Sequence, residues 1–303
     1  MNTLEIHGLK KRFGQNDVLK GVELSVPPHS VYGLIGQNGA GKTTAMRIVL
    51  GLLAQDAGEV HVCGEKVKYA ETKTNRYVGY LPDVPEFYGF MTPEEYLKLC
   101  GRIAGMHNAD IRERSEELLS LSGLKDSRKK RIAGFSRGMK QRLGIAQALL
   151  NEPKLLICDE PTSALDPMGR KEILDILEQV KEKTTVIFST HILSDVERIC
   201  DSVAILHNGT IIQDGKLEEL KTRHMVDALF LELRRPEDMQ GLLRELKGLQ
   251  VTQQDNVSLV IHAQNIDEVQ HRLMRSLARS RTAVEKLEIQ EPSLENLFME
   301  SVK

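Results

Sequence analysis

The sequence contains no tryptophan, and aromatic residues make up only 4% of its 303 positions. Proteins that bind single-stranded nucleic acid commonly stack bases on aromatic side chains, and most nucleic-acid-binding domains are strongly basic. The formal net charge here is -2. Neither feature indicates nucleic acid as a partner, and we expect none.

Cysteine is also scarce. The four cysteines, Cys63, Cys100, Cys158 and Cys200, are far apart in the sequence and form no C-x-x-C pair. This spacing is typical of reduced, mostly buried thiols in a cytoplasmic protein, and it indicates neither a disulfide framework nor a zinc site.

Long hydrophobic runs are missing as well. A membrane-spanning helix needs about 18 or more apolar residues in a row, and no segment here has that length without a charge. The N-terminus carries Glu5 and several polar residues where a secretory signal peptide would be apolar. We therefore expect a cytoplasmic chain, which requires a separate membrane protein for any role in transport.

Residues 36–43 read GQNGAGKT and fit the phosphate-loop pattern G-x-x-x-x-G-K-[ST]. An apolar run at 31–35 precedes the pattern, and a helical pattern follows it to about Leu53. Glycines let backbone N–H groups approach a phosphate, and the following helix N-terminus adds a partial positive charge. The alternative is a glycine-rich turn before a helix, but the flanks favour a nucleotide site.

The pattern also assigns roles to side chains. Lys42 is expected to reach the β- and γ-phosphates, and the Thr43 hydroxyl is expected to ligate Mg²⁺. The expected nucleotide-binding residues of this segment are Gly36, Asn38, Gly39, Ala40, Gly41, Lys42, Thr43 and Thr44.

A second segment, LLICDE at 155–160, is an apolar strand that ends in two acids. At the carboxyl end of a parallel strand, Asp159 would lie beside the metal. Glu160 could then act as general base on the water in line with the γ-phosphate. The alternative is a strand capped by solvated acids.

Strand and helix patterns predict an α/β chain. In the first part of the chain, strands are expected at 3–7, 18–26, 31–35, 59–63 and 78–81. From residue 154 onward, strands are expected at 154–158, 184–189, 202–206 and 210–214, and they alternate with helices at 168–182 and 192–199. This alternation predicts a parallel sheet with helices on both faces. Three consecutive helices between 92 and 150 predict a helical subdomain at about 86–150.

The pattern changes after about residue 220. Strands at 227–233, 249–253, 257–261 and 283–289 and helices at 236–247 and 265–279 give the order β-α-β-β-α-β, followed by a helix at 293–302. That order is the ferredoxin-like arrangement. We expect two domains, one at 1–220 and a small α+β domain at 221–303.

With further segments in a fixed order, the chain strongly resembles the ATP-binding-cassette (ABC) ATPases. Residues 135–142, FSRGMKQR, lie where that family carries its signature L-S-G-G-Q, and SALD at 163–166 resembles the D-loop. His191 resembles the switch histidine, and Phe13 lies where the family stacks an aromatic ring on adenine. The resemblance covers about residues 1–220 and implies a P-loop NTPase core with an antiparallel β edge and a helical subdomain.

The resemblance implies roles for these residues. His191 would bond the γ-phosphate and hold Glu160 and the water, so the catalytic set is Glu160, His191 and Lys42. Phe13, Ser136, Gly138 and Asp166 would join the nucleotide-binding set. Simpler structural roles stay open: a core aromatic for Phe13, helix caps for Ser136 and Asp166, and a structural histidine for His191.

Two departures from the family pattern stand out. Asp83 replaces the usual glutamine after the strand at 78–81, although some ATPases close to bacitracin and lantibiotic resistance carry Glu there. Asp83 is therefore a third expected metal ligand, with Thr43 and Asp159. The signature has Arg137 and Met139 in place of Gly and Gln, but it keeps Ser136 and Gly138.

The resemblance also implies partners. Two such domains would face each other head to tail around two ATP molecules, and with one phosphate loop per chain we expect a homodimer. Separate polytopic membrane subunits would contact residues 86–124, where Phe87, Tyr88, Phe90 and Met91 form an apolar cluster unless they pack inside the domain.

The tail EPSLENLF at 291–298 resembles that of ATPases that serve ABC-2-type exporters, which implies export of a drug, an antimicrobial peptide or a lipid-like compound. The chain would then lie on the inner face of the cell membrane. The alternative is that the tail stabilises the dimer or regulates it. The rival interpretations are a soluble ABC ATPase that acts as a mechanochemical clamp, and a ligand-binding regulator without turnover, against which Glu160 and His191 argue.

Overall fold

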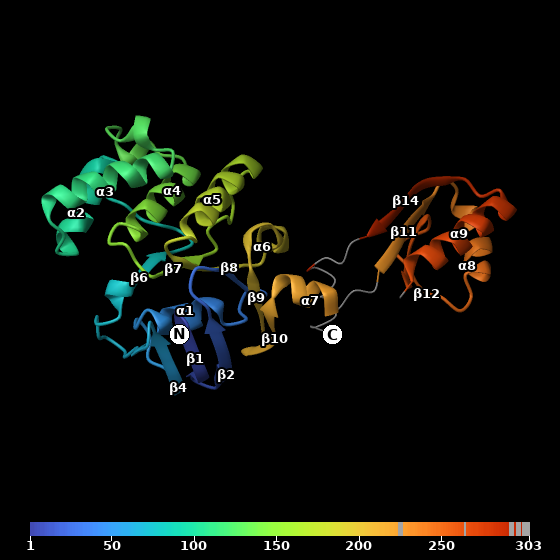
Figure 1. Cartoon of the computed structure of the whole chain (residues 1–303), viewed down its shortest axis with the longest axis horizontal. Coiled ribbons are helices and arrows are strands. Elements are labelled where there is room, and N and C mark those ends of the chain that lie inside the picture. Colours follow the sequence, from blue (N-terminus) through green and yellow to red (C-terminus); the bar gives the residue numbers. More distant parts are fainter. Residues whose placement is uncertain (224–226, 264, 291–293, 295–297, 299–303) are drawn as a thin grey trace. The chain divides into compact units, whose positions relative to one another are not determined.

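The computed structural model describes residues 1–223, 227–263, 265–290 and the single positions 294 and 298 (Figure 1). The chain divides into two compact units, Met1–Leu217 and Glu218–Lys303. The predicted helix at 293–302 and most of the EPSLENLF segment lie outside the described residues.

The first unit is built on a six-stranded sheet in the order β10-β9-β3-β8-β7-β6. The strands are β3 (Val31–Ile35), β6 (Val78–Leu81), β7 (Leu155–Asp159), β8 (Thr185–Thr190), β9 (Ser202–His207) and β10 (Thr210–Lys216). All neighbours are parallel except β10, which pairs antiparallel with β9. Every residue of β3, β7 and β8 is buried, as expected for strands covered on both faces.

Helices cover both faces of this sheet (Figure 1). Helix α1 (Lys42–Val49) packs on one face, while α5 (Pro167–Val180) and α6 (Leu193–Ile199) contact β8 and β3. Since the parallel strands share one direction, the residues after β3, β7 and β8 meet at the same edge. The phosphate loop, the two acids and His191 follow these three strands.

A second, antiparallel sheet has the order β2-β1-β4-β5. Its strands are β1 (Leu4–Phe13), β2 (Asn16–Val26), β4 (Ala57–Val62) and β5 (Glu65–Lys66). Leu4, Ile6 and Leu24 alternate with more exposed neighbours and pack with Met46 and Ile48 of α1 in one core. This sheet is the predicted antiparallel β edge, with β1 longer than the strand expected at 3–7.

The helical subdomain is confirmed as an insertion between β6 and β7. It consists of α2 (Pro93–Ile103), α3 (Asn108–Leu121) and α4 (Arg137–Ala148). Thr92 starts α2 with a capping box: its hydroxyl accepts from Glu95 N at 3.3 Å, and the Glu95 carboxylate accepts from Thr92 N at 2.8 Å. Short 3-10 helices connect the elements at Asn75–Tyr77 (η1), Lys125–Ser127 (η2) and Ile132–Gly134 (η3).

Helix α7 (Leu217–Arg223), which the sequence did not predict, starts at the last residue of the first unit and continues into the second. The further elements of the second unit are β11 (Asp227–Leu233), η4 (Pro236–Asp238), α8 (Met239–Glu245), β12 (Gln250–Gln253), β13 (Ser258–Ala263), α9 (Ile266–Ser280) and β14 (Val284–Gln290). The sheet order is β12-β13-β11-β14, and all neighbours are antiparallel. This confirms the ferredoxin-like arrangement. The helix expected at 236–247 is instead a 3-10 turn followed by a shorter α-helix.

Helix α2 offers a matched pair of substitutions. Leu97 is fully buried, whereas Ile103, six residues later, is 78% exposed. Leu97→Ala should destabilise the first unit by about 2–5 kcal/mol, because it removes buried methyl groups and leaves a cavity. Ile103→Ala should change stability by less than about 0.5 kcal/mol. Urea unfolding followed by circular dichroism measures both, and equal effects would contradict the packing described for α2.

Candidate nucleotide site

The loop between β3 and α1 depends on its glycines. Gly41 has a φ of 110°, and a Cβ there would lie 2.7 Å from Leu19 Cδ2. A Cβ on Gly36 would lie 2.5 Å from the Leu206 carbonyl oxygen. Any larger residue at these positions would force the loop away from the strands that hold it. The phosphate-loop pattern is therefore also a packing requirement here.

Helix α1 opens onto a cavity of about 710 Å³. Because Gly41 has no side chain, no cap hydrogen bond closes this end of the helix. The cavity is lined by Phe13, Val18, Gln37, Asn38, Gly39, Gly41, Lys42, Thr43, Thr44, Arg47, Tyr80, Pro82, Asp83, Val84, Asp159 and Glu160. An open helix N-terminus with its backbone N–H groups and partial positive charge is suited to an anion such as a phosphate.

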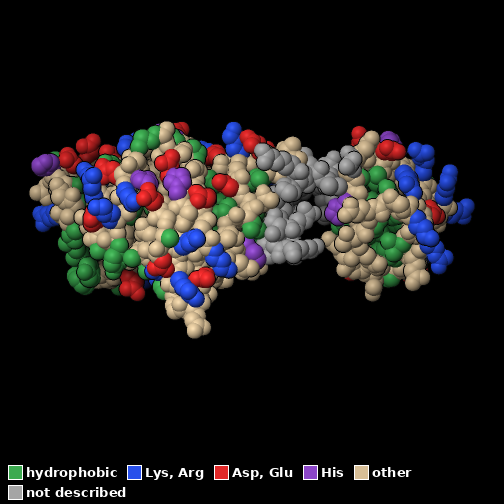
Figure 2. Space-filling model, turned by 90° about the horizontal axis from the view of Figure 1, so that it is seen from below, with side chains coloured by type: hydrophobic (Ala, Val, Ile, Leu, Met, Phe, Trp, Pro, Cys, Tyr) green, Lys and Arg blue, Asp and Glu red, His purple; other side chains and the backbone are tan. Residues whose placement is uncertain are grey.

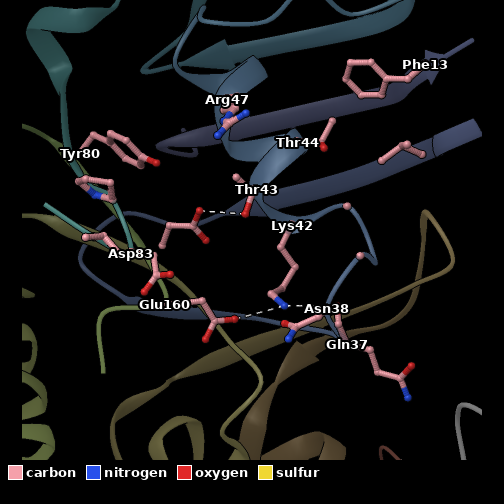
Figure 3. A pocket seen from close by; sticks show the side chains of 16 residues that line it. Phe13, Gln37, Asn38, Lys42, Thr43, Thr44, Arg47, Tyr80, Asp83 and Glu160 are labelled. Atoms are coloured by element: carbon pink, nitrogen blue, oxygen red, sulfur yellow. Dashed lines mark hydrogen bonds and ion pairs between the residues drawn. The ribbon is translucent and has the colours of Figure 1, made fainter. Parts of the chain in front are cut away.

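Lys42 is buried, and its side chain crosses this loop toward Glu160 (Figure 3). Its ammonium group donates to the Gly36 carbonyl at 2.7 Å and lies 3.4 Å from Glu160 Oε1. A buried ammonium needs such partners because it has lost its hydration. The loop thus holds a positive charge beside the cavity.

Asp159 is buried at the end of β7, and both of its carboxylate oxygens accept hydroxyl hydrogen bonds. Thr43 Oγ1 donates to Oδ2 at 2.9 Å, and Ser189 Oγ donates to Oδ1 at 2.6 Å. The three residues come from α1, β7 and β8. These contacts fix the carboxylate at the edge where the three elements meet.

Glu160 has an unusual backbone, with a φ of 48° in the left-handed region. For a residue other than glycine this conformation costs about 1–2 kcal/mol. Its N–H donates to the Ser189 carbonyl at 3.0 Å, which helps to hold the turn. Non-glycine residues in such conformations cluster at functional sites.

The two carboxylate oxygens of Glu160 have different surroundings. Oε2 lies 2.9 Å from His191 Nδ1, while Oε1 is buried and makes no hydrogen bond. Its nearest charged partner is the Lys42 ammonium. A buried acceptor with unused capacity at the wall of the cavity is suited to accept a proton or a hydrogen bond from a molecule bound there.

Asp83 lies on the opposite wall from Phe13, next to Tyr80 (Figure 3). Burial and the nearby Asp159 carboxylate raise the pKa of the Tyr80 hydroxyl, so Tyr80 stays neutral. Asp83, Thr43 and Asp159 contribute oxygen donors to one cavity. Mg²⁺ prefers oxygen ligands and normally keeps several waters or phosphate oxygens, so this donor set fits it. Within the described part of the chain, no group of three or more His, Cys, Asp or Glu side chains forms a complete metal cage.

Phe13 lines the cavity at the end of β1 and is 49% exposed. The alternative that it is a core aromatic is therefore wrong. The Lys11 ammonium lies 5.4 Å from the centre of the Phe13 ring and 3.0 Å from Asp56 Oδ1. The exposed ring is available for stacking on a planar ligand.

Several predicted residues do not line this cavity. Ser136 caps α4 by accepting from Met139 N at 3.2 Å, and Asp166 caps α5 by accepting from Gly169 N at 3.2 Å. Gly138 is the second residue of α4, and His191 reaches the site through Glu160, whose Oε2 lies 2.9 Å from its Nδ1. Gly36 and Ala40 shape the loop from behind: Gly36 accepts from Lys42, and Ala40 N donates to the Gln37 carbonyl at 3.1 Å.

The structure also brings in residues that the sequence reasoning missed. Ser189 contacts Asp159 and the backbone of Glu160. Its position two residues before His191 could have indicated that it belongs to the site. Arg47, one turn along α1 from Thr43, could have been found from helical spacing. Val18 and Tyr80 enter the cavity from other strands and carried no such signal.

Comparisons with known proteins agree with this geometry. The family model "ABC transporter" matches residues 19–163, and "ATP-binding protein DrrA1-3-like, C-terminal domain" matches residues 215–302. The ABC transporter ATP-binding protein YxlF of Bacillus subtilis is 38% identical over 299 residues, which cover 99% of each chain. The chain belongs to the ABC transporter ATP-binding proteins. Members of this family hydrolyse ATP to power transport.

Other relatives have more specific names. The linearmycin resistance ATP-binding protein LnrL of Bacillus subtilis is 31% identical over 302 residues, covering 98% of this chain and 97% of LnrL. The bacitracin transport ATP-binding protein BcrA of Bacillus licheniformis is 39% identical over 218 residues, covering 71% and 70%. None of these relatives favours the soluble clamp interpretation.

Solved structures agree with the fold. An ATP-binding subunit of an ABC transporter matches with a TM-score of 0.66 and 34% identity, over 73% of this chain and 92% of the other. The cbiO1 protein from Clostridium perfringens, part of the transporter complex cbiONQ, matches with a TM-score of 0.68 and 27% identity, over 73% and 91%. No helix in the described residues is long and apolar enough to cross a membrane.

The Ser189 contacts generate a prediction. Ser189→Ala should lower the ATPase rate constant about 10–100-fold, because it frees the Asp159 carboxylate and loosens the Glu160 turn. Ser120→Ala, on the exposed side of α3, is the matched control and should retain wild-type activity. Steady-state phosphate release measures both. Full activity in Ser189→Ala would show that the hydroxyl does not position the two acids.

Proposed function

We propose that this chain binds ATP with Mg²⁺ in the cavity at the end of β3 and β7, hydrolyses it as one half of a homodimer, and drives export through separate membrane subunits. One observation carries the proposal: Lys42, Glu160 and His191 form a continuous set of contacts, 3.4 Å and 2.9 Å long, beside the open N-terminus of α1. This set joins a phosphate-binding cation to a general base and a residue that orients it.

The chemistry follows from the individual side chains. Lys42 and the N–H groups of α1 would bind the phosphates, and Phe13 would stack on the base. Thr43, Asp159 and Asp83 would hold Mg²⁺, which would neutralise charge on the phosphate oxygens when bound. Oε1 of Glu160 would accept the proton of the attacking water, while His191 keeps Oε2 in place.

The homodimer proposal is supported by the residues that do not line the cavity. Ser136, Gly138 and Asp166 lie at the starts of α4 and α5, away from the cavity of their own chain. The sequence has one phosphate loop, so a second copy is the simplest source of a second one. The N-terminus of α4 in one chain would then face the phosphates bound to the other. ATP would stabilise the closed pair, and hydrolysis would release it.

The contact with membrane subunits is best placed at the start of the helical subdomain. A groove of about 460 Å³ is lined by Asp83, Val84, Phe87 and neighbouring residues, and Val84, Tyr88 and Phe90 are exposed. Figure 2 shows hydrophobic side chains gathered at the left end of the first unit. Phe87 also lines the groove, but its ring packs against Tyr96 of α2, with 5.0 Å between the ring centres. Asp83 and Val84 line both groove and cavity, so a subunit in the groove would contact the wall of the ATP site.

The cargo class comes from relatives. Their names include bacitracin transport, linearmycin resistance and Nod factor export. By analogy the cargo of this chain is a drug, an antimicrobial peptide or a lipid-like compound. Residues 1–220 would form the ATPase, residues 221–303 an accessory domain, and the assembly would lie on the inner face of the cell membrane.

The assignment of the base has a direct test. Glu160→Gln should bind ATP normally but hydrolyse it about 10²–10⁴-fold more slowly, because an amide cannot accept the proton of the water. With MgATP present, this variant should elute as a dimer in size-exclusion chromatography and as a monomer without it. Turnover within a few-fold of the wild type would show that another group is the base.

The docking surface has a separate test. The test uses membrane vesicles from cells that make the membrane subunits but lack the wild-type chain. The double substitution Tyr88→Ser and Phe90→Ser should weaken binding to these vesicles by about tenfold or more, because both rings are exposed and would anchor the contact. Stability should not change. Leu52→Ser, also at an exposed apolar residue, is the control and should sediment with the vesicles like the wild type. Equal sedimentation of all three proteins would place the contact elsewhere.

A further inference from the structure

The two positions that depart from the family pattern contact each other. Asp83 Oδ1 lies 3.4 Å from Arg137 Nη2, with 47% and 45% of the two side chains exposed. The main chain of Asp83 is held by the same helix, because Gln141 Nε2 donates to its carbonyl oxygen at 2.5 Å and Gln141 is fully buried. Helix α4 therefore fixes both the backbone and the side chain of Asp83.

The two partners of this ion pair belong to different parts of the proposed dimer. Asp83 lines the nucleotide cavity of its own chain. Arg137 is the first residue of α4, between Ser136 and Gly138, and lines the groove rather than the cavity. In the head-to-tail arrangement, this end of α4 would face the triphosphate bound to the partner. The ion pair would thus connect one ATP site to the other.

We propose that Arg137 is a positioning residue that serves the two ATP sites in turn, an inference that rests on the proposed head-to-tail dimer. In the free chain, the guanidinium group holds the Asp83 carboxylate. When α4 meets the partner's triphosphate, the guanidinium group turns to that more highly charged anion. Asp83 is then released to the Mg²⁺ site of its own chain.

The strength of the ion pair suits such an exchange. Exposed ion pairs shift equilibria by only about twofold to fivefold, because water and salt screen them. A phosphate group at a helix N-terminus, with an arginine beside it, offers stronger charge-assisted hydrogen bonds. The pair is therefore weak enough to open when the partner's nucleotide arrives. The same movement of Arg137 gives the partner's triphosphate a guanidinium contact and gives the Mg²⁺ site the Asp83 carboxylate. Both ATP sites are therefore completed together.

The first test is a double-mutant cycle on MgATP binding, measured by titration calorimetry at a protein concentration where the wild type is monomeric. Arg137→Ala should tighten MgATP binding about twofold to fivefold, because it frees Asp83. In the Asp83→Ala background, the same substitution should have no such effect. Arg137→Lys should restore part of the wild-type behaviour.

Lys140→Ala is the matched control, since it removes a positive charge from the same helix and the same groove. It should not tighten binding in either background. The inference would be overturned if Arg137→Ala tightened MgATP binding equally in the Asp83→Ala background. It would also be overturned if Arg137→Ala and Lys140→Ala tightened MgATP binding equally. Failure of the wild-type chain to bind MgATP would instead overturn the proposed function, and the inference with it.

The second test uses the dimer. In the Glu160→Gln background with saturating MgATP, Arg137→Ala should weaken the dimer about twofold or more in sedimentation equilibrium, because the partner's triphosphate loses its guanidinium contact. The same substitution therefore strengthens nucleotide binding by the monomer and weakens association. A purely structural role for Arg137 would not give opposite signs, and an unchanged dimer would overturn the inference.

Discussion

The double hydrogen bond to Asp159 is the contact on which the site depends. One carboxylate, buried at the end of β7, joins the first turn of α1 through Thr43 and the end of β8 through Ser189. Three elements far apart in the sequence are thereby held at one edge of the sheet. A buried carboxylate is costly unless its oxygens are satisfied, so the same contacts that orient the site also make its burial possible.

Much of this arrangement follows from the sequence. The phosphate loop predicts its strand, its helix and the roles of Lys42 and Thr43, because only glycine fits the close approaches at positions 36 and 41. The alternation of strands and helices predicts a parallel sheet, and the β-α-β-β-α-β order predicts the fold of the second unit. The strand, the helix, the sheet and the second unit are confirmed, because local spacing and burial determine them. The roles of Lys42 and Thr43 stay predictions.

Other features could not be predicted in that way. Val18 and Tyr80 reach the cavity from strands distant in the sequence, and their positions depend on sheet pairing that no local pattern records. The contact between Asp83 and Arg137 joins residues 54 positions apart. The sequence marks both residues as departures from the family pattern and Asp83 as an expected metal ligand, but no local pattern indicates their contact. The expected helix at 236–247 was wrong at its start, where Pro236–Asp238 form a 3-10 helix and α8 begins only at Met239.

The left-handed backbone of Glu160 has a consequence for the evolution of the protein. The native chain retains a strained conformation at the proposed general base, so its stability lies below what the same fold could reach. Glycine at this position would relax the backbone, but it would also remove the carboxylate that faces the buried Lys42 ammonium and His191. Selection for a relaxed backbone is therefore opposed at this position by the contacts of the side chain.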